Sequence, residues 1–100
     1  MKELEKEFIG IGEVKDFRFK QILSNNYAYM YEVKNPDVYE VYYEVFERRI
    51  NEQFGCVSYP KGKAFGIWAW CITDYDRAKE KFDWLTKRTE KRARGFDNEQ

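Results

Sequence analysis

The sequence predicts an α+β domain in which an antiparallel sheet of four or five strands, in hairpin order, carries one C-terminal helix on one face. Two observations support this prediction. Aromatic and β-branched residues recur at every second position from Val38 to Phe46 and again from Phe65 to Trp70, a pattern typical of strands. After Thr73, apolar residues instead recur three and four positions apart, which indicates an amphipathic helix.

The 100 residues are expected to form a single domain. Asn-rich and Pro-containing segments mark the turns, because Asn tolerates positive φ and Pro fixes the backbone. These segments are 24–26, 35–37 and Pro60–Lys63, the last of which would close a final hairpin with Cys56 opposite Ile67. The strands are then expected at about 9–23, 27–34, 38–48, 55–59 and 64–73.

The segment 38–54 has a second interpretation as a helix. Asn35 could cap such a helix, Pro36 could occupy its first position, and Gly55 could follow its end. The alternation of apolar side chains favours the strand, and the helix remains the alternative.

The C-terminal helix is expected over residues 74–94. Thr73 and Asp76 form a capping-box pattern, and Gly95 supplies the stop. Tyr75, Ala78, Phe82 and Leu85 would form its buried stripe. The core of the whole domain is expected to contain Phe17, Phe19, Tyr39, Tyr43, Trp68, Trp70, Phe82 and Leu85.

Charge and composition limit the classes of function. The 18 basic and 18 acidic residues cancel, so no global field would attract DNA or an anionic membrane. Residues 1–58 carry a net charge of −3, whereas residues 59–94 carry +5. The first seven residues are charged with no apolar run behind them, and no stretch is apolar enough for a membrane span. We therefore expect a cytoplasmic protein that does not bind membranes.

Enzymatic chemistry has little support in the sequence. The chain contains no histidine, which removes the usual general base and the commonest transition-metal ligand. Glu40 and Glu44 are interpreted as solvent-facing charges on one strand face, and Cys56 and Cys71 as reduced thiols too far apart for a disulfide. We expect no catalytic residues, no cofactor and no metal.

Aromatic residues occupy both faces of the predicted strands. One helix can cover only one face, so Tyr42 and Phe46 would lie on a second face that is apolar and rich in tyrosine. That face is either covered by the N-terminal segment and loops, or it contacts a partner, which could be a second copy of the chain.

Trp84 lies opposite the buried stripe of the predicted helix, among basic residues. Three interpretations are open: the indole covers the rim of the sheet, binds a protein partner, or stacks on a nucleobase while lysines meet phosphate. The basic residues involved are Lys81, Lys87, Arg88 and Lys91.

These features favour a small non-catalytic interaction module. Its partner would be a protein, with a homodimer as one form, bound through the aromatic sheet face. The alternative is a nucleic-acid-binding protein that uses the basic helix and Trp84.

Overall fold

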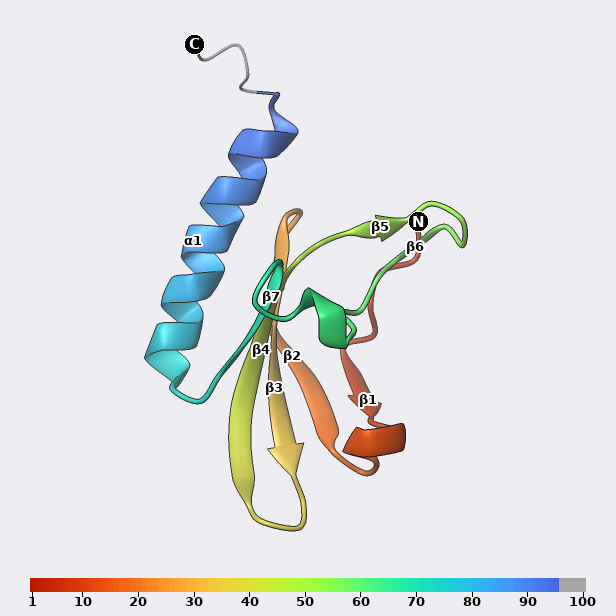
Figure 1. The fold of residues 1–100 in the computed structure, drawn as a ribbon, viewed down its shortest axis with the longest axis vertical. Helices are drawn as coiled ribbons and strands as arrows, with labels where there is room; N and C mark the ends of the chain where they lie inside the picture. The colour runs from red at the N-terminus through yellow and green to blue at the C-terminus, as the bar shows by residue number, and fades with distance from the viewer. Residues whose placement is uncertain (96–100) are drawn as a thin grey trace.

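The computed structural model describes residues 1–95 and confirms the α+β class. A five-stranded antiparallel sheet carries one helix, α1 (Tyr75–Ala93), on one face (Figure 1). Neighbouring strands follow the order β1 (Glu7–Ile9), β2 (Arg18–Ser24), β3 (Ala28–Asn35), β4 (Glu40–Glu47) and β7 (Ala69–Ile72). A separate two-stranded hairpin contains β5 (Ile50–Asn51) and β6 (Cys56–Val57), and two 3₁₀ turns are η1 (Gly12–Val14) and η2 (Gly62–Ala64).

The first predicted strand, 9–23, is broken in two. Gly12 and Asp16 adopt positive φ values of 65° and 70°, and η1 turns the chain between them. As a result, β1 folds back onto β2, with Phe8 opposite Phe19.

Two strands, β4 and β5, lie within the segment 38–54, so the helical alternative for that segment is wrong. β4 pairs with β3 over its whole length, from Asn35↔Glu40 to Ala28↔Glu47. The strand starts two residues later than predicted because Pro36–Tyr39 form the connecting turn, in which the Asn35 side chain accepts a hydrogen bond from the Asp37 N–H at 3.0 Å. Tyr39 closes this turn with φ +50° and is 95% exposed, so its assignment to the core was wrong.

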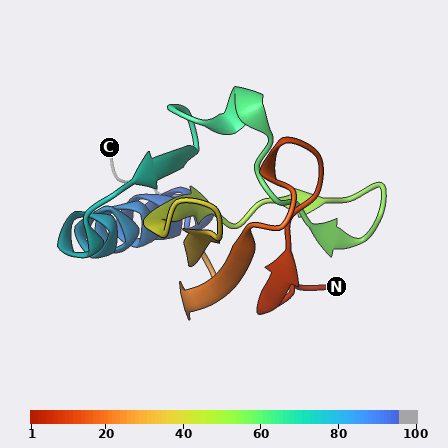
Figure 2. The same ribbon diagram turned by 90° about the horizontal axis from the view of Figure 1, so that it is seen from below.

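The predicted final hairpin around Pro60–Lys63 is also wrong. Val57 pairs with Ile50 of β5 instead of with a residue of β7. The reason is a tight turn between β5 and β6, formed by the Asn51 side chain and by Gly55, whose φ is +63°. Cys56 therefore lies opposite Asn51 and not opposite Ile67. Residues 58–68, including η2, arch from β6 to β7 (Figure 2). Both cysteines are free thiols.

The helix begins and ends close to its predicted bounds. Its N-cap is Asp74, whose carboxylate accepts a hydrogen bond from the Arg77 N–H at 2.9 Å. Gly95 follows the helix with φ +62°, and its N–H bonds to the Arg92 carbonyl. Ala78, Phe82 and Leu85 are buried as predicted, whereas Tyr75 lies at the edge of the helix, exposed and packed against Tyr43.

The sheet has an apolar cluster on each face. On the helix face, Ala78, Phe82 and Leu85 of α1 pack on Ala28, Met30 and Val45. The opposite face is built from aromatic rings and small apolar side chains. Its buried members are Phe19, Tyr29, Tyr31, Val33, Phe46, Val57, Ala64 and Ala69.

The aromatic face is covered by the chain itself. Residues 1–6 run along it and join the β5–β6 hairpin, with the Val57 N–H bonded to the Lys2 carbonyl at 2.8 Å. The Tyr31 hydroxyl donates a hydrogen bond to the Glu5 carbonyl at 2.5 Å, and the Tyr29 hydroxyl donates one to the Glu3 carboxylate. Of the two alternatives for this face, the structure therefore shows coverage by the N-terminal segment and loops.

The remaining core predictions divide into two groups. Phe19, Phe82 and Leu85 are buried. The half-buried residues, which pack at the margins of the two clusters, are Phe17, Tyr43, Trp68 and Trp70.

Candidate functional site

Trp84 lies on α1 where the helix meets β7, the edge strand of the sheet. Its indole packs edge-on against Trp70 of β7, with ring centroids 6.0 Å apart and an interplanar angle of 81°. The side chain nevertheless remains 45% exposed. The indole therefore covers the rim of the sheet and presents part of its surface to solvent.

Two cations lie over the Trp84 ring. Lys81 Nζ is 4.5 Å from the ring centroid and the Arg88 guanidinium carbon is 4.4 Å from it. Both also lie over Trp70, at 4.8 and 5.8 Å. Lys81 and Arg88 are one turn before and after Trp84, which is the spacing that brings helical side chains to the same face. Cation–π attraction thus holds the four side chains in one cluster.

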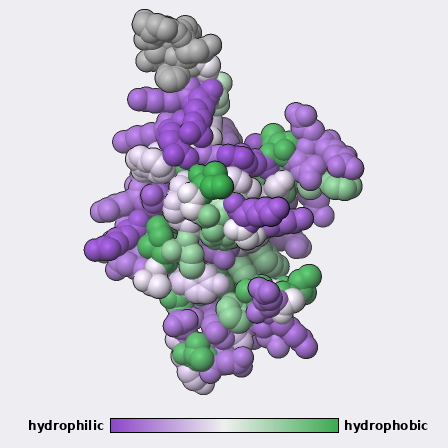
Figure 3. Space-filling view, in the orientation of Figure 1, coloured by the Kyte–Doolittle hydropathy of each residue, from purple (hydrophilic) through white to green (hydrophobic). Residues whose placement is uncertain are grey.

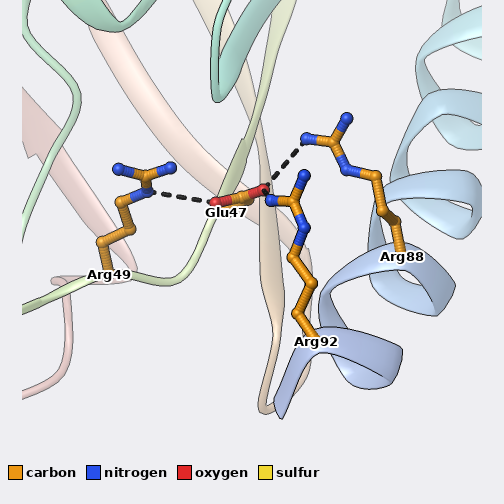
Figure 4. A network of polar contacts seen from close by, with 4 residues as sticks. All are labelled: Glu47, Arg49, Arg88 and Arg92. Carbon is orange, nitrogen blue, oxygen red and sulfur yellow. Dashed lines mark hydrogen bonds and ion pairs between the residues drawn. The ribbon is translucent and has the colours of Figure 1, made fainter. Parts of the chain in front are cut away.

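Arg88 is also held by a buried carboxylate on the sheet. Glu47, at the end of β4, is 4% exposed and accepts charge-assisted bonds from Arg88 at 3.0 Å and Arg92 at 3.2 Å. Arg49 completes the network at 3.0 Å from the other side of the carboxylate (Figure 4). Arg49 in turn lies over the Trp68 ring, 4.7 Å from its centroid. The network fixes α1 to the end of β4.

The remaining basic residues of this face point into solvent. Lys87 and Lys91 are exposed, and neither forms an ion pair with a residue in the range 1–95. Below them, a shallow groove of about 470 Å³ is lined by Ile72, Arg77, Glu80, Lys81 and Trp84. The side of α1 visible in Figure 3 is mostly hydrophilic, with paler patches between the charged side chains. We call the residues Arg77, Lys81, Trp84, Lys87, Arg88 and Lys91 the Trp84 surface.

β7 is an edge strand beside the Trp84 surface. The preceding loop covers the start of this edge, because Ala69 forms a bridge with Phe65 and its carbonyl accepts the Gly66 N–H at 2.7 Å. The Glu47 N–H donates a hydrogen bond to the Trp68 carbonyl at 3.0 Å. Hydrogen-bonded and non-hydrogen-bonded pairs alternate along an antiparallel ladder, so this bond fixes which residues of β7 bond to β4. By that alternation, the backbone N–H and C=O of Cys71 point away from β4. Burial and the nearby Glu44 carboxylate raise the pKa of the Cys71 thiol, which keeps it protonated.

Tyr42 and Phe46 do not belong to this site. Both lie on the aromatic face of the sheet, where Phe46 is fully buried against Tyr59 and Tyr31. Tyr42 is half-buried, and burial together with neighbouring Glu44 raises its pKa to about 12. The structure brings together Trp84, Lys81 and Arg88, with Lys87 and Lys91 beside them, and places the two sheet residues elsewhere.

Two buried glutamates were not identified from the sequence. Glu44 was interpreted as a solvent-facing charge but is only 8% exposed, because the N-terminal segment and the chain after β6 cover its face of β4. Glu47 received no role. Glu44 lies within the alternating aromatic run and Glu47 directly follows it, so a carboxylate beside buried apolar positions of a central strand was the available signal.

Within the described part of the chain, no helix is long and apolar enough to cross a bilayer. No group of three His, Cys, Asp or Glu side chains in residues 1–95 is arranged to hold a metal ion. No family model, curated protein or solved structure matches the chain.

Proposed function

We propose that the chain is a non-catalytic binding module whose Trp84 surface contacts an acidic segment of a partner protein. The observation that carries the proposal is the exposed indole of Trp84, fixed between two cations and beside two lysines without ion-pair partners in residues 1–95. Tryptophan and arginine dominate binding energy at protein interfaces, and excess positive charge favours an acidic partner.

Two further features support a protein segment as the ligand. The groove beside Trp84 is lined in part by Ile72 of β7, so it offers an apolar contact next to the charges. The outward N–H and C=O of Cys71 provide main-chain hydrogen bonds to an extended segment laid along the edge of the sheet.

A nucleic acid is the less favoured ligand for this surface. Nucleobase stacking requires a free face of the indole. Lys81 and Arg88 both lie over the Trp84 ring and therefore compete with a nucleobase for its π surface.

The test is a titration followed by the backbone amide signals of the labelled protein. The probes are a peptide of alternating Glu and Val, the same peptide with Lys in place of Glu, and single-stranded oligothymidine. We expect the Glu peptide alone to shift the amides around Ile72, Lys81 and Trp84. Trp84→Ala should weaken this binding by about tenfold or more.

Two charge variants sharpen the test. Replacing both Lys87 and Lys91 by Glu should abolish binding. Lys20→Glu, at an exposed position of β2 away from α1, is the control for reversal of a surface charge. Binding of oligothymidine with a steep loss at high salt would replace the proposal by the nucleic-acid alternative. If neither the Glu peptide nor oligothymidine binds, the proposal is contradicted.

Self-association is examined by light scattering over a concentration series at low and high salt. Residues 1–58 carry a net negative charge and residues 59–94 a net positive charge. Acidic groups of a second copy are therefore available to contact the Trp84 surface. A dimer that Trp84→Ala dissociates would make a second copy of the chain the partner in place of an acidic segment.

A further inference from the structure

Glu44 is a buried carboxylate that meets no cation. It lies on the aromatic face of β4, and the Tyr59 hydroxyl donates a hydrogen bond to its Oε1. Within residues 1–95 no Lys or Arg forms an ion pair with it, and no hydrogen bond reaches its Oε2.

This arrangement disfavours the ionised form of the Glu44 carboxyl group. A carboxylate removed from water needs an opposite charge and hydrogen bonds to all its oxygens, or its ionised form is disfavoured. Burial accordingly raises the pKa of Glu44, and the Tyr59 hydrogen bond only partly opposes the shift. The chemical group that would complete the site is a cation that also donates hydrogen bonds.

Glu44 lines a cleft of about 910 Å³ between the N-terminal segment, η1 and the chain after β6. This volume is that of a small-molecule site. Apart from Glu44, the charged residues of the lining are exposed, as at Lys2 and Lys61. The apolar lining includes Leu4, Phe8, Ile11, Val14, Val57 and Phe65.

The inner end of the cleft is rigid. The Tyr59 ring meets Phe8, Phe19 and Phe46 edge-on, with centroids 5.5, 5.9 and 5.1 Å away, and this packing fixes its hydroxyl at Glu44. At the wall, a Cβ on Gly10 would lie 2.3 Å from the Val14 carbonyl oxygen, so only glycine allows the chain to pass there.

We propose that this cleft binds an apolar organic amine, whose ammonium group pairs with the Glu44 carboxylate while its aromatic or alkyl body packs against the apolar lining. The aromatic rings around Glu44 also favour a cation, because their faces carry negative charge density. This site lies on the face of the sheet opposite α1, so it is separate from the Trp84 surface and does not depend on the proposed protein binding.

The test uses three amines, 2-phenylethylamine, tryptamine and n-hexylamine, with 2-phenylethanol as the uncharged counterpart of the first. Binding is measured by calorimetry, and the site is located from the amide shifts of Gly10 and Val57. We expect at least one amine to bind at roughly millimolar concentration or better. The alcohol should bind about tenfold or more weakly, since it lacks the charge-assisted bond.

Glu44→Gln keeps the shape of the side chain and removes its charge, so it should weaken amine binding by about tenfold or more. Glu40→Gln, on the same face of β4 but exposed, is the matched control and should leave binding unchanged. Trp84→Ala should also leave it unchanged, which separates this site from the proposed protein-binding surface. The proposal is overturned if none of the amines binds, if the alcohol binds as tightly as the amine, or if folded Glu44→Gln retains full affinity.

Discussion

Glu44 and Glu47 are three residues apart on β4 and both are buried, yet they lie on opposite faces of the sheet and in opposite electrostatic settings. Three guanidinium groups surround Glu47, whereas Glu44 meets a single tyrosine hydroxyl. One carboxylate is therefore paired with cations by the fold, whereas the other has no ion-pair partner within residues 1–95. This difference leads to two predictions on stability.

The first prediction concerns the pH dependence of stability at Glu44. Its pKa is raised in the folded protein by burial, so its contribution to stability is complete below the unfolded pKa of about 4.5 and is lost as pH rises through the folded value. Glu44→Gln removes this loss. We expect the variant to gain stability over the wild type as pH rises above about 4.5, as measured by urea unfolding at a series of pH values. Equal pH profiles for the two proteins would contradict the prediction.

The second prediction concerns the arginine network. Glu47→Gln leaves Arg88 and Arg92 without their carboxylate, and since these side chains are partly exposed they can turn to water. We expect a loss of about 1–3 kcal/mol in the free energy of unfolding. Glu90→Gln breaks an exposed helical pair with Arg94 and should cost less than about 1 kcal/mol. Equal losses in the two variants would mean that burial of Glu47 adds nothing.

A third prediction concerns acid sensitivity at Glu3. Hydrogen bonds from Arg48 and Tyr29 lower the pKa of its carboxyl to about 2. A lowered folded pKa gives stability that is present above the unfolded value of about 4.5 and is lost as pH falls towards about 2. Glu3→Gln should therefore have a lower free energy of unfolding than the wild type at neutral pH. This difference in free energy, measured by urea unfolding, should narrow as pH falls from about 4.5 to about 2. Glu7→Gln, on exposed β1, is the control, and a difference that stays constant with pH would show that Glu3 titrates normally.

The fourth prediction concerns the turn between β3 and β4. Tyr39 holds φ at +50° with its ring in solvent, a conformation that costs a residue with a Cβ about 1–2 kcal/mol. Tyr39→Gly should raise the free energy of unfolding by roughly 0.5 kcal/mol after the greater freedom of glycine in the unfolded chain is subtracted. Tyr39→Ala should change it little in urea melts, and a loss above about 2 kcal/mol would place the ring in a packed environment.

The sequence predicted the class of fold and the C-terminal helix because these depend on local periodicity. Alternation over 38–46 and the apolar stripe ending at Leu85 are properties of neighbouring residues. The errors arose where a turn decided the pairing. Positive φ at Tyr39 shifted the start of β4, and the Asn51–Gly55 turn paired β6 with β5 in place of β7. Such conformations leave little trace in a hydrophobic pattern.

The candidate site was only partly accessible from the sequence. The helical spacing of Lys81, Trp84 and Arg88 predicted that they share a face, and they do. Their contact with Trp70 and with Glu47 joins α1 to β7 and β4, which requires the tertiary fold. The burial of Glu44 depends likewise on the N-terminal segment and on the chain after β6, both distant from it in sequence.

The closure of the aromatic face by residues 1–6 has a consequence for the order of folding. Lys2 bridges to Cys56 and Glu3 pairs with Arg48, so this layer forms only after a long loop has closed. The β2–β3–β4 hairpins join neighbouring strands through short turns and should form first. Substitutions at Glu3 should then accelerate unfolding in stopped-flow experiments while leaving the folding rate nearly unchanged. The central hairpins would thus act as the nucleus, and the layer of residues 1–6 would be added to a sheet that has already formed.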